Sequence, residues 1–404
     1  MGVSFVIPVR NGGRWLDSVL TSIRAQARLG PFEIIAIDDG STDDSAAILS
    51  RHQSLGDMRV LRGDGAGAAA AINRGVRAAV HQLIAQVDQD VVLSPTWVAR
   101  LVEAFGDPQV AAAQGRYVPN SDAYHEGSVP LRKQGQTPHA SVPLRDQGQT
   151  PRGSVPLREQ GQTTHGSVLL REQRQTPQWG QAPQDIWSRV MALDLALRYR
   201  RLPPTTNHVC TGNSVYRRSA LLEVGLFDEG LGYGYDNDVS YRLVGAGYRL
   251  AFCHDAGSVH HWREGVVDYA RQQYGFGYGR LNLLARHPQR VAGDNVSGLS
   301  MMLQGPATAL AVAAGAIAVA AVAADAPWVV PASVALSLVA VLIAERFAAG
   351  LWAAVLFRDP AGLGFVPVHA VRNLAWVAAM TAWTARTLFG VRSRPVHSMR
   401  PRSL

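Results

Sequence analysis

Residues 84–93 read IAQVDQDVVL, an apolar run interrupted by Asp88 and Asp90. A run of this length predicts a buried strand rather than a helix. Residues two positions apart point to the same side of a strand, and a bend at the strand end also lets both carboxylates converge on one cation. Buried paired carboxylates are costly unless a positive charge lies between them. A hard divalent cation carrying a diphosphate would satisfy both, whereas Asp-Gln-Asp taken alone is better explained by an exposed turn.

Apolar runs alternate with helical patterns on the N-terminal side of this stretch. Uniformly apolar strands that alternate with helices predict a parallel sheet covered on both faces. We expect the helix that follows the second strand to be capped by Ser41 or Thr42. The expected strands are residues 3–9, 32–37 and 59–61, and the expected helices are residues 15–27, 44–53 and 68–85.

Polar residues follow three of these strands directly: Asn11, Asp39 and Asp88. In parallel α/β sheets, ligands bind beyond the carboxyl ends of the strands, so these residues are candidates for one binding site. The segment GDGAG, residues 63–67, lacks the spacing of the dinucleotide-binding fingerprint, which argues against a dinucleotide site.

The composition favours a membrane-associated protein over a nucleic-acid-binding one. The 404 residues include 39 Lys and Arg against 31 Asp and Glu, and the excess is mostly Arg in the repeats and the C-terminal third. We interpret this charge as complementary to a membrane surface and to phosphate, and no nucleic-acid motif is visible. The only cysteines, Cys210 and Cys253, predict no disulfide framework and no metal-ligand spacing, but reduced, buried thiols. The N-terminus lacks the features of a signal peptide, so we expect it to stay in the cytosol.

Several segments in a fixed order resemble the family 2 glycosyltransferases of the GT-A fold. They are FVIPVRNGGRWL, IIAIDDGSTDDS, AAAINRGV and QVDQDVVLSPTWV, followed by CTGNSVYRRSALLEVGLFDEGLGYGYDNDVSYRLVGAGYRL. The resemblance covers roughly residues 2–120 and 186–290. It implies an α/β nucleotide-diphospho-sugar transferase fold, with a mostly parallel central sheet and helices on both faces.

The resemblance also implies roles for particular residues. The first loop and the second-strand aspartate would hold the nucleoside, and Asp88 and Asp90 would hold the diphosphate through Mg²⁺ or Mn²⁺. Arg10 departs from the aromatic or small residue that the family often has there. The implied nucleotide-sugar-binding residues are Pro8, Val9, Asn11, Asp39, Asn73 and Asp88.

GYGYDNDVSYR, residues 232–242, forms a second acidic cluster. Attack of a hydroxyl on an anomeric carbon needs a base, and an aspartate is adequate because the alcohol becomes acidic only as the bond forms. The family's usual form is Glu-Asp-x-Asp, and here Tyr235 stands at the Glu position. By resemblance Asp236 is the catalytic base, and Asp238 is an acceptor-site candidate or a helix-start charge that complements the macrodipole.

AGSVHHWRE, residues 256–264, contains His260 and His261. His260 is a candidate third metal ligand beside Asp90, although a lone histidine is more often a structural hydrogen-bonding group. Trp262 is a candidate for stacking on a sugar, and core packing is the alternative.

The aromatic and basic segment YARQQYGFGYGR, residues 269–280, follows. Its Arg271 and Arg280 are candidates for stabilising the charge of the leaving group.

A 13-residue unit, GSVPLRKQGQTPH, begins at residue 127 and returns at 140, 153 and 166 with few changes. Such repetition is typical of a solenoid, but each unit carries too little apolar surface to offset chain ordering. We therefore expect residues 121–183 to be a disordered insert in a surface loop. A tether for anionic lipid or a partner is the alternative.

The C-terminal region predicts membrane helices. Residues 306–324 carry no charge and span about 30 Å as a helix, which matches one hydrocarbon core. Residues 328–344 form a second such run, and residues 347–357 and 365–388 are either interfacial helices or, for the latter, a third span. Arginines at 392, 394, 400 and 402 favour a cytosolic tail, hence two spans plus interfacial helices. A soluble bundle fits two adjacent charge-free runs poorly.

These observations predict four parts: residues 1–120 and 184–295 as the two halves of the GT-A domain, 121–183 as the insert, and 300–404 as the membrane region. The expected function is a metal-dependent, inverting glycosyltransferase of the cell envelope. It would use a nucleotide-diphosphate sugar and a lipid-linked or glycan acceptor, at the cytoplasmic (inner) membrane with its catalytic domain in the cytosol. The alternatives are a processive polysaccharide synthase and a non-catalytic nucleotide-binding membrane scaffold.

Overall fold

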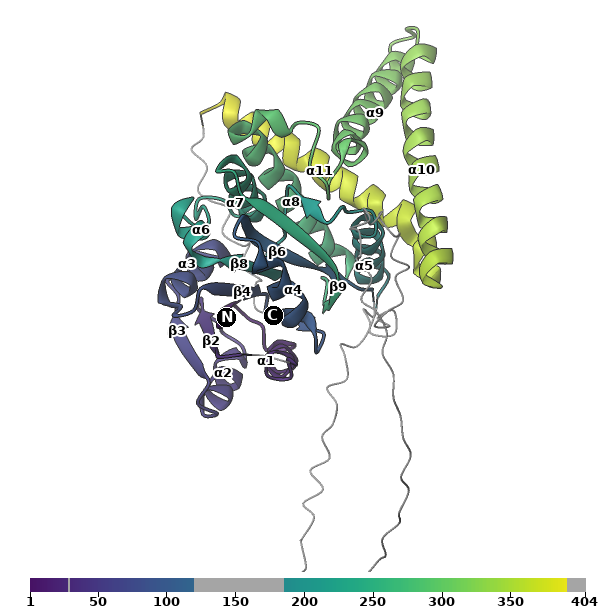
Figure 1. The fold of residues 1–404 in the computed structure, drawn as a ribbon. Coiled ribbons are helices and arrows are strands. Elements are labelled where there is room, and N and C mark those ends of the chain that lie inside the picture. The colour runs from purple at the N-terminus through teal and green to yellow at the C-terminus, as the bar shows by residue number, and fades with distance from the viewer. Residues whose placement is uncertain (28–29, 120–184, 391–404) are drawn as a thin grey trace, which may run out of the picture. The chain divides into compact units, whose positions relative to one another are not determined.

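The computed structural model describes residues 1–27, 30–119 and 185–390 (Figure 1). Its strands are β1 Val3–Val9, β2 Phe32–Asp38, β3 Met58–Arg62, β4 Leu83–Val87, β5 Val91–Leu93, β6 Val110–Tyr117, β7 Thr205–Thr206, β8 Asn213–Arg217 and β9 Arg249–His260. Its helices are α1 Leu16–Arg24, α2 Ser45–Gln53, α3 Ala68–Ala78, α4 Trp97–Glu103, α5 Ile186–Tyr199, α6 Arg218–Glu223, α7 Tyr235–Gly245, α8 Val266–Arg286, α9 Leu299–Ala323, α10 Val329–Phe357 and α11 Phe365–Leu388.

The strands form one mixed sheet in the order β3-β2-β1-β4-β8-β6-β9-β5, with β7 paired to β9. The first four of these strands are parallel, as predicted. Strand β8 is antiparallel to both of its neighbours, and β6 and β9 are parallel to each other. The sheet is therefore the mostly parallel α/β sheet that the sequence predicts, with an antiparallel strand inserted near its middle.

Alternate residues of each strand point to opposite faces of the sheet. Both faces therefore carry apolar side chains, and helices cover both. Phe5 and Ile7 of β1 pack in one apolar core with Leu20 of α1. Val6, which lies between them, packs in a second core with Ile72 of α3. The prediction of helices on both faces is thus confirmed.

Two boundaries in the N-terminal half differ most from the prediction. Helix α3 ends at Ala78 instead of residue 85, because Leu83 is already paired with Val3 of β1. The run at residues 84–93 is not one strand: β4 pairs with β1 and β8, whereas β5 leaves to pair with β9. Asp88, Gln89 and Asp90 form the turn between these two strands.

The predicted cap of α2 is also wrong. Asp43, rather than Ser41 or Thr42, binds the first turn, with its Oδ1 accepting hydrogen bonds from the Ser45 backbone N–H and hydroxyl at 3.1 and 2.6 Å. Ser41 and Thr42 are instead engaged with Asn11, in the loop that follows β1.

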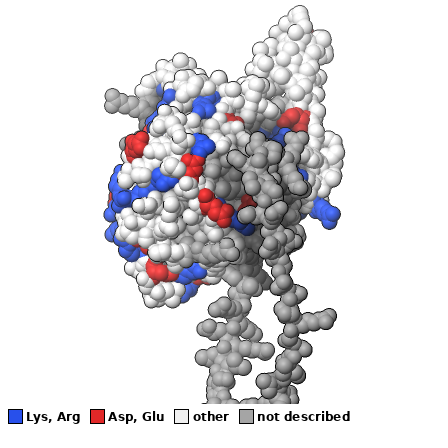
Figure 2. All heavy atoms as spheres, viewed as in Figure 1, with Lys and Arg blue, Asp and Glu red and all other residues white. Residues whose placement is uncertain are grey.

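Three helices of the described part of the chain are long and apolar enough to cross a membrane, within Leu299–Ala323, Val329–Phe357 and Pro360–Leu388. Helix α10 runs unbroken to Phe357, so the prediction of a separate interfacial helix at residues 347–357 is wrong. On the face drawn in Figure 2, the outer part of the α9–α10 hairpin carries no charged residue. Length and apolarity therefore give three candidate spans rather than the two that we favoured.

The predicted insert at residues 121–183 and the arginines at 392, 394, 400 and 402 lie outside the described residues. The predictions made for them, and the four-part division of the chain, stay predictions.

A buried carboxylate joins the α/β part of the chain to the apolar helices. Asp194 of α5 pairs with Arg198 at 2.9 Å, and with Arg346 of α10 and His369 of α11 at 3.4 and 3.6 Å. Burial would raise the pKa of Asp194, but the positive charges of Arg198 and its other partners outweigh burial and hold that pKa well below its usual value. Asp194 is therefore the carboxylate that pairs with arginines of α5 and α10 and lies beside His369 of α11.

Replacement of Asp194 by alanine is expected to lower the free energy of unfolding by about 3 kcal/mol, because it leaves buried cations unpaired. The measurement is the thermal midpoint of the detergent-solubilised full chain. The control is Asp268→Ala, which removes an exposed partner of Arg271 and should change stability by less than about 0.5 kcal/mol. Equal midpoints for the two variants would contradict a structural role for Asp194.

Candidate active site

A cavity of about 440 Å³ opens beyond the carboxyl ends of β1, β2 and β4. Its size falls within the range of small-molecule sites. It contains eight of the residues singled out from the sequence: Pro8, Val9, Asp39, Asp88, Asp90, Asp236, His260 and Trp262.

The turn after β4 is held in place by the loop after β1. The Arg10 backbone N–H donates to Gln89 Oε1 at 2.7 Å, and Gln89 Nε2 donates back to the Arg10 carbonyl at 3.0 Å. A Cβ at Gly12 would lie 2.5 Å from Gln89 Oε1, so this loop requires glycine there. With Gln89 anchored to this loop, Asp88 and Asp90 on either side of it line the cavity.

Strand pairing explains why a histidine lies beside these aspartates. Antiparallel β5 and β9 place Val91 opposite His260, and the turn before Val91 contains Asp90. His260 Nε2 is 3.7 Å from Asp90 Oδ1, and Asp88, Asp90 and His260 offer ligand atoms that all lie within 4.8 Å of one another. His261 does not join this group, because its ring stacks on Trp15 at a centroid distance of 3.6 Å.

The electrostatics of this group fit a divalent cation. Burial, together with the negative charge of Asp90, raises the pKa of Asp88 to about 6, and burial raises the pKa of Asp90 to about 6 against the opposing charge of Arg263. Burial lowers the pKa of His260 to about 4, so its imidazole is neutral. Two crowded carboxylates and a neutral imidazole are a donor set that suits Mn²⁺ or Mg²⁺.

Binding of Mn²⁺ is expected to weaken at acidic pH. The folded-state pKa values of about 6 lie above the unfolded aspartate value of about 3.9, so the metal-free chain loses stability as the pH rises from about 4 through 6. Mn²⁺ needs the ionised carboxylates, so its affinity at pH 5 should be about 10-fold lower for each aspartate than at pH 7.5. The measurement is the rise in thermal midpoint on adding Mn²⁺ at the two pH values. Equal shifts at both would contradict ligation by this pair.

Asp39 lines the same cavity and directly follows β2. Its two carboxylate oxygens accept hydrogen bonds from the backbone N–H groups of Gly65 and Gly67, at 2.8 and 2.9 Å. The Arg10 guanidinium lies 3.7 Å from the same carboxylate. Arg10, whose departure from the family pattern was noted above, therefore lines the cavity as a charge partner of Asp39.

Asp236 enters the cavity from the first turn of α7. Gly234 precedes the helix with φ +82°, a left-handed conformation that favours glycine, and thereby turns the chain into α7. Asp236 Oδ1 accepts from the Asn237 backbone N–H at 2.9 Å, while Oδ2 lies 3.8 Å from His208 Nε2. Asp236 therefore lines the cavity with one of its oxygens facing a histidine.

Five of the residues singled out from the sequence lie elsewhere, namely Asn11, Asn73, Asp238, Arg271 and Arg280. Asn11 binds Thr42 in the loop after β1. The buried Asn73 amide holds Phe227 and Glu229, so it orders the loop before α7.

The other three of these residues form ion pairs with side chains outside the cavity lining. Asp238 pairs with Arg242 and His287, and Arg280 pairs with Asp294 at 3.5 Å. Arg271 lies on an exposed face of α8 beside Asp268.

Other cavity-lining residues were not predicted, and the most informative are Gln89, Tyr117, Cys210 and Arg263. Cys210 is a free, half-buried thiol, which corrects the prediction of a buried one. Two residues before it lies His208, and two donors at alternate positions of an extended segment point to the same side. This His-x-Cys spacing is the signal in the sequence that could have identified His208 and Cys210 as site residues.

Comparison with known proteins identifies the family. The family model described as "Glycosyl transferase family 2" matches residues 4–225, more than half of the 404 residues. The chain belongs to glycosyl transferase family 2. The matched range contains Asp39, Asp88 and Asp90 and ends before Asp236.

Individual relatives agree with this family 2 membership. The pre-mycofactocin glycosyltransferase of Mycobacterium tuberculosis is 27% identical over 305 residues, which are 74% of this chain and 51% of that protein. The hyaluronan synthase of Pasteurella multocida is 33% identical over 100 residues, 24% of this chain and 10% of that one. The chain thus spans about half the length of the mycobacterial relative, and far less of the synthase.

A solved structure shows the same fold. The mannosyltransferase PcManGT from Pyrobaculum calidifontis, in complex with GDP-Man and Mn²⁺, superposes with a TM-score of 0.51 at 15% identity. The match covers 96% of this chain and 88% of the mannosyltransferase. This family 2 chain therefore has the GT-A fold that its sequence predicts.

Proposed function

We propose that this family 2 chain is a membrane-anchored, inverting glycosyltransferase that moves a sugar from a nucleotide-diphosphate sugar to an acceptor hydroxyl. One observation carries the proposal: Asp39, Asp88, Asp90 and Asp236, which lie up to 197 positions apart in the sequence (236 − 39), line the same cavity. So many carboxylates around one hollow repel one another unless cations are bound there.

The nucleoside is held between the ends of β1 and β2. Pro8 and Val9 form an apolar wall, and Asp39 offers carboxylate oxygens fixed by Gly65 and Gly67. Carboxylate oxygens accept hydrogen bonds from ribose hydroxyls or from base N–H groups. The GDP-Man in the mannosyltransferase of the same fold supports a nucleotide sugar as the donor.

Asp88, Asp90 and His260 would hold Mn²⁺ or Mg²⁺ against the diphosphate. When bound, such an ion neutralises charge on the departing diphosphate. Arg263 adds a positive charge near Asp90. Because Arg263 lines the cavity and Arg271 and Arg280 do not, Arg263 replaces them as our candidate for stabilising the leaving group. Trp262, beside it, offers an aromatic face to a sugar, although its ring also stacks on His260.

Asp236 acts as the base. The acceptor oxygen forms a bond to the anomeric carbon while the bond from that carbon to the diphosphate oxygen breaks. The hydroxyl proton passes to Asp236, and the diphosphate leaves with the bonding electron pair. Attack from the side opposite the leaving group inverts the configuration at the anomeric carbon.

The acceptor reaches the cavity from the membrane side. Gln272 and Phe276 of α8 line the cavity, and Gly277 on the same helix packs against Trp376 and Ala379 of the apolar helix α11. One helix thus separates the cavity from a candidate membrane span. This placement supports a lipid-linked or envelope-glycan acceptor. The proposal also has the catalytic domain on the cytosolic side of the inner membrane.

The proposal is tested by a thermal-shift screen of nucleotide-diphosphate sugars against the full chain, with and without Mn²⁺, followed by a transfer assay with the sugar that binds. A ligand that binds only the folded state stabilises that state by about 2.7 kcal/mol at 100 times its Kd. The matching donor should therefore raise the thermal midpoint by several degrees. We expect this rise only when Mn²⁺ is present. No shift with any nucleotide sugar would contradict the proposal, and shifts without transfer or hydrolysis would favour the non-catalytic scaffold.

A further inference from the structure

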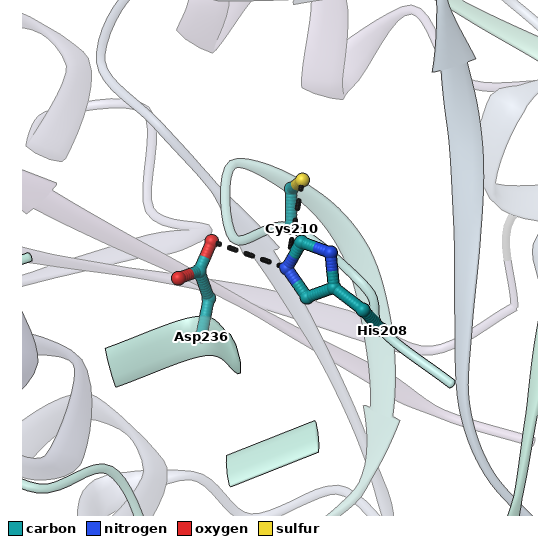
Figure 3. A group of neighbouring side chains, drawn as sticks. All are labelled: His208, Cys210 and Asp236. Atoms are coloured by element: carbon teal, nitrogen blue, oxygen red, sulfur yellow. Dashed lines mark hydrogen bonds and ion pairs between the residues drawn. The ribbon is translucent and has the colours of Figure 1, made fainter. Parts of the chain in front are cut away.

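A second group of donor atoms lies in the wall of the cavity. His208, Cys210 and Asp236 offer a ring nitrogen, a thiol sulfur and a carboxylate oxygen, all within 4.8 Å of one another (Figure 3). His208 lies between the other two: its Nε2 is 3.9 Å from Cys210 Sγ and 3.8 Å from Asp236 Oδ2. This group contains sulfur, so it differs in chemistry from the oxygen-rich group of Asp88, Asp90 and His260 in the same cavity.

The spacing of these atoms is close to that of an occupied zinc site. With Zn–S near 2.3 Å and Zn–N and Zn–O near 2.0–2.2 Å, tetrahedral geometry separates sulfur from nitrogen by about 3.6 Å and nitrogen from oxygen by about 3.4 Å. The separations of 3.9 and 3.8 Å in the structure exceed these by only a few tenths of an ångström. A small side-chain movement therefore completes three ligands, and the fourth position faces the cavity, which Cys210 and Asp236 line.

Neighbouring side chains position two of the three ligands, His208 and Cys210. Asp294, whose side chain is fully buried, places Oδ1 3.9 Å from His208 Nδ1, which is itself buried and has no hydrogen-bond partner among the described residues. A carboxylate behind the non-ligating nitrogen is the arrangement that directs Nε2 of a histidine toward a metal. The Tyr199 hydroxyl donates to Cys210 Sγ at 3.1 Å and accepts from Gln114 Nε2 at 2.6 Å, so hydrogen bonds fix the position of the sulfur.

We infer that His208 Nε2, Cys210 Sγ and the Asp236 carboxylate form a binding site for a soft or borderline divalent cation such as Zn²⁺. The ion takes the place of a proton on Nε2 and of the thiol proton. Nitrogen and sulfur ligands select Zn²⁺ or Co²⁺ over the Mn²⁺ and Mg²⁺ that carboxylates favour, so the two groups in this cavity take different ions. The consequence for catalysis rests on the function proposed above: Zn²⁺ bound here occupies Asp236 and inhibits sugar transfer even when Mn²⁺ saturates the other group.

Cobalt(II) absorption spectroscopy tests the site without any substrate. The full chain in detergent is first saturated with Mn²⁺, and Co²⁺ is then added. We expect a thiolate-to-cobalt charge-transfer band that saturates at one equivalent per chain, is abolished in Cys210→Ser and persists in Cys253→Ser. Cys253 is the matched control, since it is the only other cysteine, and burial raises the pKa of its thiol to about 11.

A second measurement on the unaltered chain covers the case in which a variant fails to fold. Zn²⁺ should slow alkylation of Cys210 at least 10-fold, as followed by mass spectrometry of its peptide, and should leave the alkylation rate of Cys253 unchanged. Absence of the cobalt band together with unslowed alkylation of Cys210 would overturn the inference, as would a band that survives in Cys210→Ser. Neither outcome depends on transfer activity, so a chain that transfers sugar yet binds no Co²⁺ through sulfur would refute this site and leave the proposed function standing.

Discussion

Asp236→Asn is expected to lower the rate of sugar transfer by about 10³-fold or more while leaving donor binding intact. A positioned general base contributes about 10²–10⁴-fold, and an asparagine amide has no lone pair basic enough to take the acceptor proton. The substitution keeps the size of the side chain, so the Oδ1 contact to the Asn237 backbone N–H can be retained. The measurements are kcat for transfer and, separately, the Kd for the donor in the presence of Mn²⁺.

Asp238→Asn is the matched control for this substitution. Asp238 lies two residues further along α7 but pairs with Arg242 and His287 outside the cavity. It should lower the thermal midpoint and leave kcat of the folded protein within a few-fold of the unaltered chain. If Asp236→Asn transferred sugar at the original rate, Asp236 would not be the base. If it lost donor binding in parallel, its role would be in binding the donor instead.

Asp90→Ala is expected to abolish the effect of Mn²⁺ on the affinity for a nucleoside diphosphate, a loss of about 10³-fold under saturating Mn²⁺. The substitution removes one of two carboxylate ligands, and a bound divalent ion contributes several kcal/mol of charge stabilisation to phosphate groups. It also relieves the repulsion that helps to raise the pKa of Asp88, so the metal-free protein should become more stable at pH 7.5. Titration calorimetry with and without Mn²⁺ measures the first effect, and thermal unfolding measures the second.

The control for Asp90→Ala is Asp64→Ala. Asp64 is an exposed aspartate that pairs with Arg74 and does not line the cavity. Its removal should change neither the metal dependence nor the stability by more than about 0.5 kcal/mol. An Asp90→Ala protein that still binds nucleoside diphosphate more tightly with Mn²⁺ would show that the ion is held elsewhere.

Much of the cavity could be predicted from the sequence because strand ends are local features. Apolar runs that stop at Val9, at Asp38 and at Val87 mark the carboxyl edge of a parallel sheet, and whatever polar residues follow them must meet at that edge. This reasoning placed Asp39 and Asp88 correctly beside one hollow without any knowledge of helix packing. The family resemblance added Asp236, which no strand pattern would have brought there.

The parts that could not be predicted depend on contacts between distant segments. The resemblance implied that Asn73 of α3 binds the nucleotide sugar, but the loop that contains Phe227 uses its amide. Arg280 lies on α8, which also carries the cavity-lining Gln272 and Phe276, but its side chain pairs with Asp294 and does not line the cavity. His208 drew no attention because its partners, Asp236 and Asp294, are 28 and 86 positions further along (236 − 208 and 294 − 208).

The membrane region illustrates the same limit. The second charge-free run was expected to end at residue 344, directly before Glu345 and Arg346, because charged side chains are costly in hydrocarbon. Arg346 is instead neutralised by Glu345 and by Asp194 of α5, so α10 continues through it to Phe357. Only the tertiary contact reveals that these charges face protein rather than lipid.

The most direct test is a crystal structure of the full chain with Mn²⁺ and a nucleoside diphosphate, recorded with anomalous scattering from manganese. We predict one strong anomalous peak within about 2.5 Å of carboxylate oxygens from both Asp88 and Asp90, with the diphosphate on its open side and the nucleoside against Asp39. A manganese peak away from these two aspartates, or a nucleotide bound outside the cavity that Asp39 and Asp236 share, would contradict the proposed function.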